Sequence, residues 1–183
     1  MRCFKLPLCL ILIITLTACS KSQFMDLSGF IENYNEVAED EITFTDFIYA
    51  PGASREYKLI RDNILLTLKE APDGKICECR VMMTKLTKNG EQSKNISTDS
   101  KNFLYILKNT LQTFCFYDRY SAEALMGEFS LGEPSTFLKE GELTKKQDNF
   151  YFVYYSTPLM CQVMIYNTYL TEIEPTSKPG SRN

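Results

Sequence analysis

The chain has 183 residues, of which 44% are hydrophobic and 13% aromatic, so it contains enough apolar material for a packed core. It carries 20 basic and 23 acidic residues, and its largest basic cluster is Lys145-Lys146, so we expect no nucleic-acid partner, because phosphate binding needs a basic face. Histidine is absent. This excludes serine or cysteine nucleophiles activated by imidazole, and the usual zinc and iron sites, unless a partner supplies the imidazole. We therefore predict no catalytic residue, cofactor or metal.

The first 18 residues have the three parts of a secretory signal peptide. Arg2 and Lys5 form a basic start, an apolar run follows from Leu6 to Ile14, and small or polar residues precede Cys19. A transmembrane helix needs roughly 20 apolar residues, and this run is shorter. We therefore expect the leader to be cleaved rather than retained.

The sequence Leu16-Thr17-Ala18-Cys19 resembles the lipobox of bacterial lipoprotein precursors. The resemblance implies that residues 1–18 are removed and that Cys19 receives a thioether-linked diacylglycerol. Two acyl chains would anchor the protein stably to a bacterial membrane, outside the cytoplasm. Residues 19–25 would then be a short lipidated tether, and the processed chain would carry 18 basic and 23 acidic residues, a net charge of −5. The alternative is an ordinary secretory signal that is cut elsewhere.

After the tether, the pattern predicts a helix and then strands. Apolar residues at helical spacing predict an amphipathic helix over 23–40, capped by Asp26 or Ser28. Residues 42–50 favour a strand. Three more strands are predicted over 57–60, 63–70 and 76–87, and Ala71-Pro72-Asp73-Gly74 is typical of the turn that joins the last two into a hairpin.

The second half of the chain repeats this order. Residues 88–100 are polar and predict an exposed loop, and a second helix should follow to Phe116, capped within 97–99. Its buried stripe would be Phe103, Leu107, Leu111 and Phe114. A shorter helix over 121–129 is expected, with Ser121 as its cap, then breaks at Gly132, Pro134 and Gly141 and a hairpin of strands over 149–156 and 160–171. We expect one domain over residues 26–175 and a disordered tail over 176–183.

The two hairpins can be aligned with each other. Residues 62–68 match 148–154, both beginning with Asp-Asn, and residues 76–81 match 160–165. These matches favour an α+β fold with an antiparallel sheet, helices on one face and two related helix-plus-hairpin repeats. In outline the arrangement resembles the β-lactamase-inhibitor-protein type of fold. The alternative is that any two hairpins share alternating apolar residues.

The four cysteines that follow Cys19 fit two interpretations. Cys77 and Cys79 should lie on one strand face as small core residues, since side chains two apart point the same way. A disulfide between Cys115 and Cys161 is the other interpretation, because an exported domain lies in oxidising surroundings.

An aromatic run over 150–155 places rings on both faces of one strand. One face must enter the core. The other face, with its neighbours on the next strand, could form an exposed binding surface or be covered by a second layer. The residues of this candidate surface are Tyr151, Tyr155, Tyr166, Met160 and Met164.

These features favour a non-catalytic, lipid-anchored cell-envelope protein that binds another envelope protein or an envelope component across its sheet. A lipoprotein that binds a small ligand or solute is the second hypothesis, and an enzyme independent of histidine is the third. A flat exposed aromatic surface would support the first hypothesis, and a deep pocket with converging polar groups would support the others.

Overall fold

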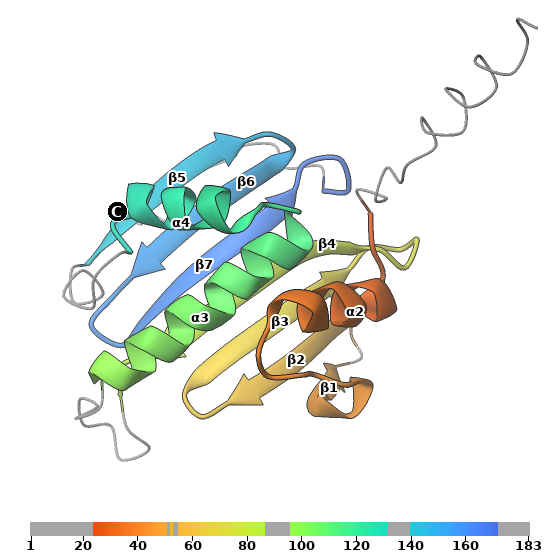
Figure 1. The fold of residues 1–183 in the computed structure, drawn as a ribbon, viewed down its shortest axis with the longest axis horizontal. Coiled ribbons are helices and arrows are strands. Elements are labelled where there is room, and N and C mark those ends of the chain that lie inside the picture. The colour runs from red at the N-terminus through yellow and green to blue at the C-terminus, as the bar shows by residue number, and fades with distance from the viewer. Residues whose placement is uncertain (1–23, 51, 53–54, 87–95, 132–139, 172–183) are drawn as a thin grey trace, which may run out of the picture.

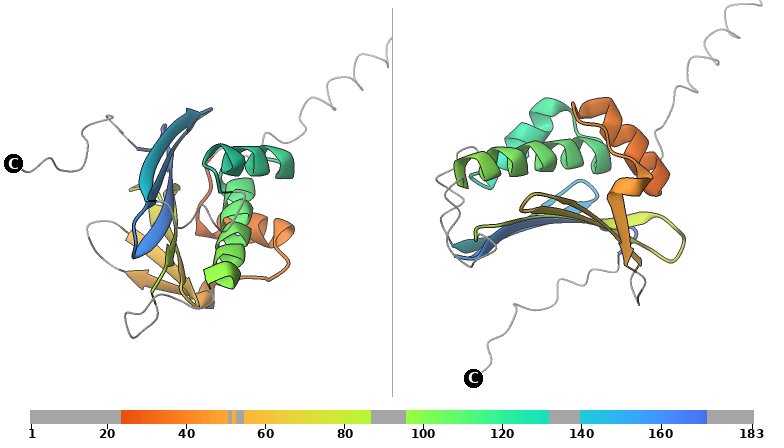
Figure 2. Two further views of the ribbon diagram at one scale, coloured as in Figure 1. Left: turned by 90° about the vertical axis from the view of Figure 1, so that its left-hand side faces the viewer. Right: turned by 90° about the horizontal axis from the view of Figure 1, so that it is seen from below.

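The protein folds into one seven-stranded antiparallel sheet with three helices packed against one face (Figures 1 and 2). The structure is a computed structural model and describes residues 24–50, 52, 55–86, 96–131 and 140–171. The helices are α2 (Leu27–Val37), α3 (Ile96–Phe114) and α4 (Arg119–Glu128), with a 3₁₀ turn η2 (Phe44–Asp46). The strands are β1 (Phe47–Ala50), β2 (Arg55–Arg61), β3 (Ile64–Glu70), β4 (Ile76–Thr84), β5 (Gly141–Gln147), β6 (Phe150–Ser156) and β7 (Met160–Asn167).

The predicted α+β architecture is confirmed, and the helical stripes are the ones that the sequence indicates. Asp26 caps α2 by accepting a hydrogen bond from the Gly29 amide at 2.9 Å. Four residues of α3 at helical spacing are at most 2% exposed and face the sheet: Phe103, Leu107, Leu111 and Phe114. α3 contacts β3, β4 and both other helices, so it is the centre of the helical layer.

Each strand sends alternate side chains into the core and away from it. In β6, for example, Phe150, Phe152 and Tyr154 are buried under the helices, whereas Tyr151 and Tyr155 point to the other side. The strand order is β1-β2-β3-β4-β7-β6-β5. No helix or strand in the described part of the chain covers the second side of the sheet (Figure 2), and we call this side the open face.

Several predicted boundaries are wrong for local reasons. The strand expected over 42–50 is limited to Phe47–Ala50, because Asp46 bonds back to the Thr43 amide and closes a 3₁₀ turn. The cap of α4 is Asp118 rather than Ser121, whose own amide donates to Asp118 Oδ1 at 2.7 Å. Helix α3 begins at Ile96, inside the segment expected to be loop. Strand β5 was not predicted at all.

The two halves of the sheet repeat the same local geometry. β2-β3-β4 and β5-β6-β7 are both antiparallel meanders, and they meet where β4 pairs with β7. Asp62 and Asp148 begin matching turns with φ of 54° and 52°. In one turn Asn63 O accepts from the Thr84 amide at 3.0 Å, and in the other Asn149 O accepts from the Thr168 amide at 2.8 Å. The alignment of the two hairpins therefore has a structural counterpart.

Some predicted features lie outside the described residues. These are the leader over 1–18, Cys19 with most of its tether, and the tail over 176–183. They stay predictions.

Candidate functional site

The five residues of the predicted binding surface all lie on the open face. Tyr151 pairs across the strands with Tyr166, and their rings are 6.5 Å apart. Met164 pairs with Val153, Tyr155 lies opposite Gln162, and Met160 lies opposite Thr84. All five side chains are half-buried, because neighbours on a pleated sheet shield one another. The structure thus brings together what the sequence pattern selected.

The strand register extends this surface across the sheet in rows. Each row contains residues that face one another on neighbouring strands, and all project from the open face. One row runs from β2 to β6 through Ile60, Leu65, Met82, Gln162 and Tyr155. The next contains Lys58, Thr67, Arg80, Met164 and Val153, and the third contains Glu56, Lys69, Glu78, Tyr166 and Tyr151.

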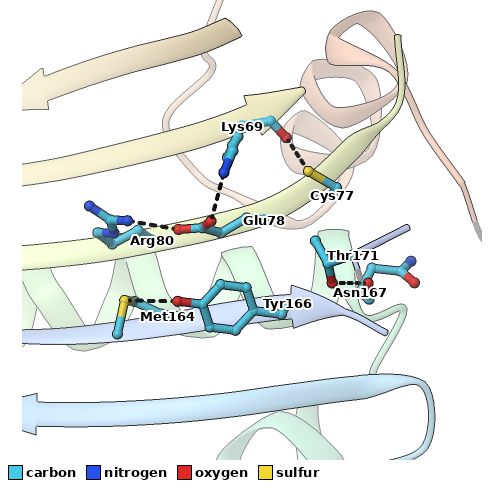
Figure 3. A network of polar contacts seen from close by, with 8 residues as sticks. All are labelled: Lys69, Cys77, Glu78, Arg80, Met164, Tyr166, Asn167 and Thr171. Atoms are coloured by element: carbon cyan, nitrogen blue, oxygen red, sulfur yellow. Dashed lines mark hydrogen bonds and ion pairs between the residues drawn. The ribbon is translucent and has the colours of Figure 1, made fainter. Parts of the chain in front are cut away.

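A charged network borders the aromatic part of the face (Figure 3). Arg80 Nη2 donates to Glu78 Oε1 at 2.8 Å, and Lys69 Nζ lies 3.9 Å from Glu78 Oε2. The Glu78 side chain is only 8% exposed, whereas Arg80 is 38% exposed. Arg80 Nε is buried and has no hydrogen-bond partner among the described residues. The network therefore holds a guanidinium at the surface with one donor unused.

Tyr166 and Met164 lie beside this network on β7. The Tyr166 hydroxyl donates to Met164 Sδ at 3.2 Å, a weak acceptor (Figure 3). Burial raises the pKa of Tyr166, and the nearby Glu78 carboxylate raises it further, so the hydroxyl stays protonated at neutral pH. The Tyr166 side chain therefore offers an apolar ring face next to a protonated hydroxyl.

A cavity of about 640 Å³ opens near one end of the charged network. Its lining includes Arg55, Lys69, Glu70, Cys77 and Thr171. Arg55 pairs with Glu70 at 3.0 Å, and Tyr57 donates to the same carboxylate at 2.6 Å. The Cys77 thiol is 3% exposed and donates to Lys69 O at 3.4 Å. Hydrogen-bonding groups of both charges thus converge on this cavity.

Cys77 and Cys79 do not share one environment. The register of β3 and β4 shifts between Lys69 and Glu70, so Cys79 joins the core while Cys77 lines the cavity. All four described cysteines are free thiols.

Cys115 and Cys161 are therefore not joined by the predicted disulfide in this structure. Burial raises the pKa of the Cys161 thiol to about 12, so it is an unreactive core residue.

A buried lysine lies at the other end of β4, under the helices. Lys85 is 1% exposed, and its Nζ donates to Ser156 Oγ and to Thr157 O, both at 2.8 Å. Burial lowers the pKa of this amine. Because both acceptors flank the β6–β7 turn, the lysine holds that turn against the end of β4.

Comparisons with known proteins give no assignment. No protein-family model matches the chain, and neither a curated protein nor a solved structure is significantly similar to it. Within the described residues, no group of three or more histidine, cysteine or acidic side chains could hold a metal ion. None of the helices found in the described segments has the length and apolar character to cross a membrane.

Sequence reasoning missed the charged half of the open face. Glu78, Arg80 and Met82 alternate with the core residues Cys79 and Val81, so simple period-two alternation contained the signal. The pairing of β4 with β7, which places these side chains beside Met164 and Tyr166, joins residues about 85 positions apart and has no local signal.

Proposed function

We propose that this chain is a lipid-anchored protein of the bacterial cell envelope and that its domain binds another protein, or an envelope component, across the open face of its sheet. The observation that carries the proposal is the uncovered surface of tyrosine, methionine and valine on β6 and β7. Tyrosine, methionine and arginine are enriched at protein interfaces, where rigid rings bury a large area at low entropic cost.

The two halves of the sheet support this choice of face. Their core residues are apolar in both halves, as in Leu66 and its counterpart Phe152. On the open face β3 and β4 contain Lys69, Glu78 and Arg80 beside Leu65 and Met82, whereas β6 and β7 contain three tyrosines and two methionines and no charged residue. The two halves therefore have similar apolar cores and differ in the surface that a partner would contact.

The charged network gives the proposed interface its polar border. A partner that covers the tyrosines would also meet Arg80, whose side chain is 38% exposed and whose guanidinium can donate to a carbonyl or carboxylate oxygen. Shape alone does not fix the register of a flat contact, and such a hydrogen bond would do so. The five side chains of the aromatic surface lie half-buried side by side on one sheet face, which fits a broad partner better than a small ligand.

The anchor is tested by changing Cys19. Cells that make Cys19→Ala are labelled with a radioactive fatty acid, and we expect label on the wild-type chain only. The N-terminal residue of the mature protein is then determined. Label on the variant, or a mature chain that begins elsewhere than at Cys19, would contradict lipid anchoring.

The binding face is tested by photocrosslinking in intact cells. A photoreactive phenylalanine replaces Tyr155 on the open face, and in a matched strain it replaces Lys101, which is exposed on α3. We expect one discrete crosslinked species from position 155, lost when Val153→Lys is added, and none of that size from position 101. Equal crosslinking from both positions would contradict the proposed face.

The cavity beside Cys77 favours a small ligand as the second candidate. Its volume lies within the range of small-molecule sites, and Arg55, Lys69 and Glu70 supply polar groups at its wall. A screen of envelope metabolites by thermal shift would support this candidate if a hit lost its effect in Lys69→Met. A hit whose effect persists in that variant would not use this cavity.

A further inference from the structure

The described chain begins at one particular end of the sheet. Met25 O accepts a hydrogen bond from the Ile76 amide at 2.8 Å, which fixes residue 25 to the first residue of β4. The β3–β4 and β5–β6 turns and the residues after β7 lie at the same end. We call it the proximal end. The opposite end carries the β6–β7 turn.

Exposed aromatic side chains gather at the proximal end. Tyr169 is 65% exposed, and the Phe24 ring packs edge-to-face against it with centroids 6.3 Å apart. The Tyr169 amide donates to Asn167 Oδ1 at 3.0 Å, so the ring is attached to the end of β7. The Tyr117 ring contacts Phe150, the first residue of β6, at this end. Tyr120 comes three residues later, in the first turn of α4, and is 82% exposed. Tyr169 and Tyr120 are the most exposed large apolar side chains among the described residues.

The proposed lipid anchor is within reach of these rings. Five peptide units separate Cys19 from Phe24, so the two Cα atoms can be at most about 18 Å apart. The residues between them, Ser20 to Gln23, are polar. The proximal end must therefore stay close to the headgroups of any bilayer that holds the acyl chains.

Charge gives no strong electrostatic reason for membrane contact at this end. Its five acidic residues nearly balance its four basic residues: Asp26, Glu70, Asp73, Asp118 and Asp148 against Arg55, Lys75, Arg119 and Lys146. Aromatic rings are favoured in the headgroup layer even without such attraction, because a tyrosine has an apolar body and a polar tip.

We propose that Phe24 and Tyr169 insert into the headgroup layer and fix the orientation of the domain on the bilayer. This inference rests on the lipid anchor of the proposed function. The strands then rise from the membrane, and the β6–β7 turn lies roughly 23 Å further out, at 3.3 Å per residue of β7. In this orientation the open face is perpendicular to the bilayer surface, so a partner can approach it from the side.

The absence of tryptophan makes the orientation measurable, because one introduced indole is the only such fluorophore. The full-length lipidated protein is prepared as Tyr169→Trp and, as the matched control, as Leu159→Trp, which is 59% exposed in the β6–β7 turn. Each variant is bound to phosphatidylcholine vesicles with and without bromine near the headgroup end of the acyl chains. Bromine quenches indole fluorescence on close approach.

We expect brominated lipid to lower the emission of Trp at position 169 by about twofold, as for a ring at the interface, and to leave position 159 unchanged. Raising the salt concentration should not release this contact. Equal emission at position 169 in both lipids, from protein shown by mass to carry the acyl chains, would overturn the orientation alone. If instead the protein isolated from cells carries no acyl chains and is found in the soluble fraction, the anchor and the orientation are overturned together.

Discussion

Neighbouring residues of β6 provide a quantitative test of which side of the sheet is covered. Phe152 is fully buried under the helices and contacts the rings of Phe129 and Phe150. Phe152→Ala should lower the free energy of unfolding by about 3 to 5 kcal/mol, from lost burial and the cavity left behind. Tyr151, one residue away on the open face, is half-buried and has one recorded ring contact, with Tyr166. Tyr151→Ala should cost about 1 kcal/mol.

The assay is urea unfolding at 25 °C, followed by circular dichroism, on the chain produced from Ser20 onwards. For a slope near 2 kcal/mol per molar urea, Phe152→Ala should move the midpoint by roughly 2 M and Tyr151→Ala by about 0.5 M. Tyr166→Ala is the matched control from the neighbouring strand and should resemble Tyr151→Ala. Equal losses at positions 151 and 152 would mean that the open face is covered in the folded chain.

Three further predictions concern buried or constrained groups. Burial raises the pKa of Tyr34 from 10.0 to about 12, so the folded state keeps a proton that the unfolded chain loses, and stability should fall by about 2 kcal/mol between pH 10 and 12. The stability of Tyr34→Phe should fall less steeply over that range, and an identical slope would refute the assignment. Asp62→Val should lower the free energy of unfolding by about 1 to 2 kcal/mol, because a β-branched residue is strained at a φ of 54°, and an unchanged urea midpoint would contradict this. Lys85→Met should cost about 1 to 3 kcal/mol by leaving Thr157 O without its buried donor, and hydrogen exchange should quicken in the β6–β7 turn; unchanged exchange there would argue against the clamp.

The sequence predicted the elements whose side chains bury a regular stripe. The stripe of α3 and the alternation of β6 are both set by burial against one layer, so their periodicity is visible in the chain. The similarity of the two Asp-Asn turns was also visible in the sequence, because each turn needs a residue that tolerates positive φ.

The features that sequence reasoning missed depend on long-range or edge effects. β5 is an edge strand exposed along most of its length, so Gly141–Gln147 shows no apolar alternation. The bulge that separates Cys77 from Cys79 arises from the pairing of β3 with β4. The position of the charged residues of β4 beside the tyrosine and methionine of β7 depends on the long-range pairing of these two strands, which has no local signal.

Thiol protection in the native envelope tests the central claim most directly. All four described cysteines are buried, so Val153→Cys supplies a half-buried thiol on the open face, and Lys101→Cys supplies an exposed thiol on the helical layer. Both are labelled with a maleimide, once in isolated envelopes and once in the purified protein. We predict that position 153 reacts at least about tenfold more slowly in envelopes than in the purified protein, as a desolvated interface centre would, while position 101 reacts equally in both. Equal reactivity of position 153 in both preparations would contradict binding across the open face.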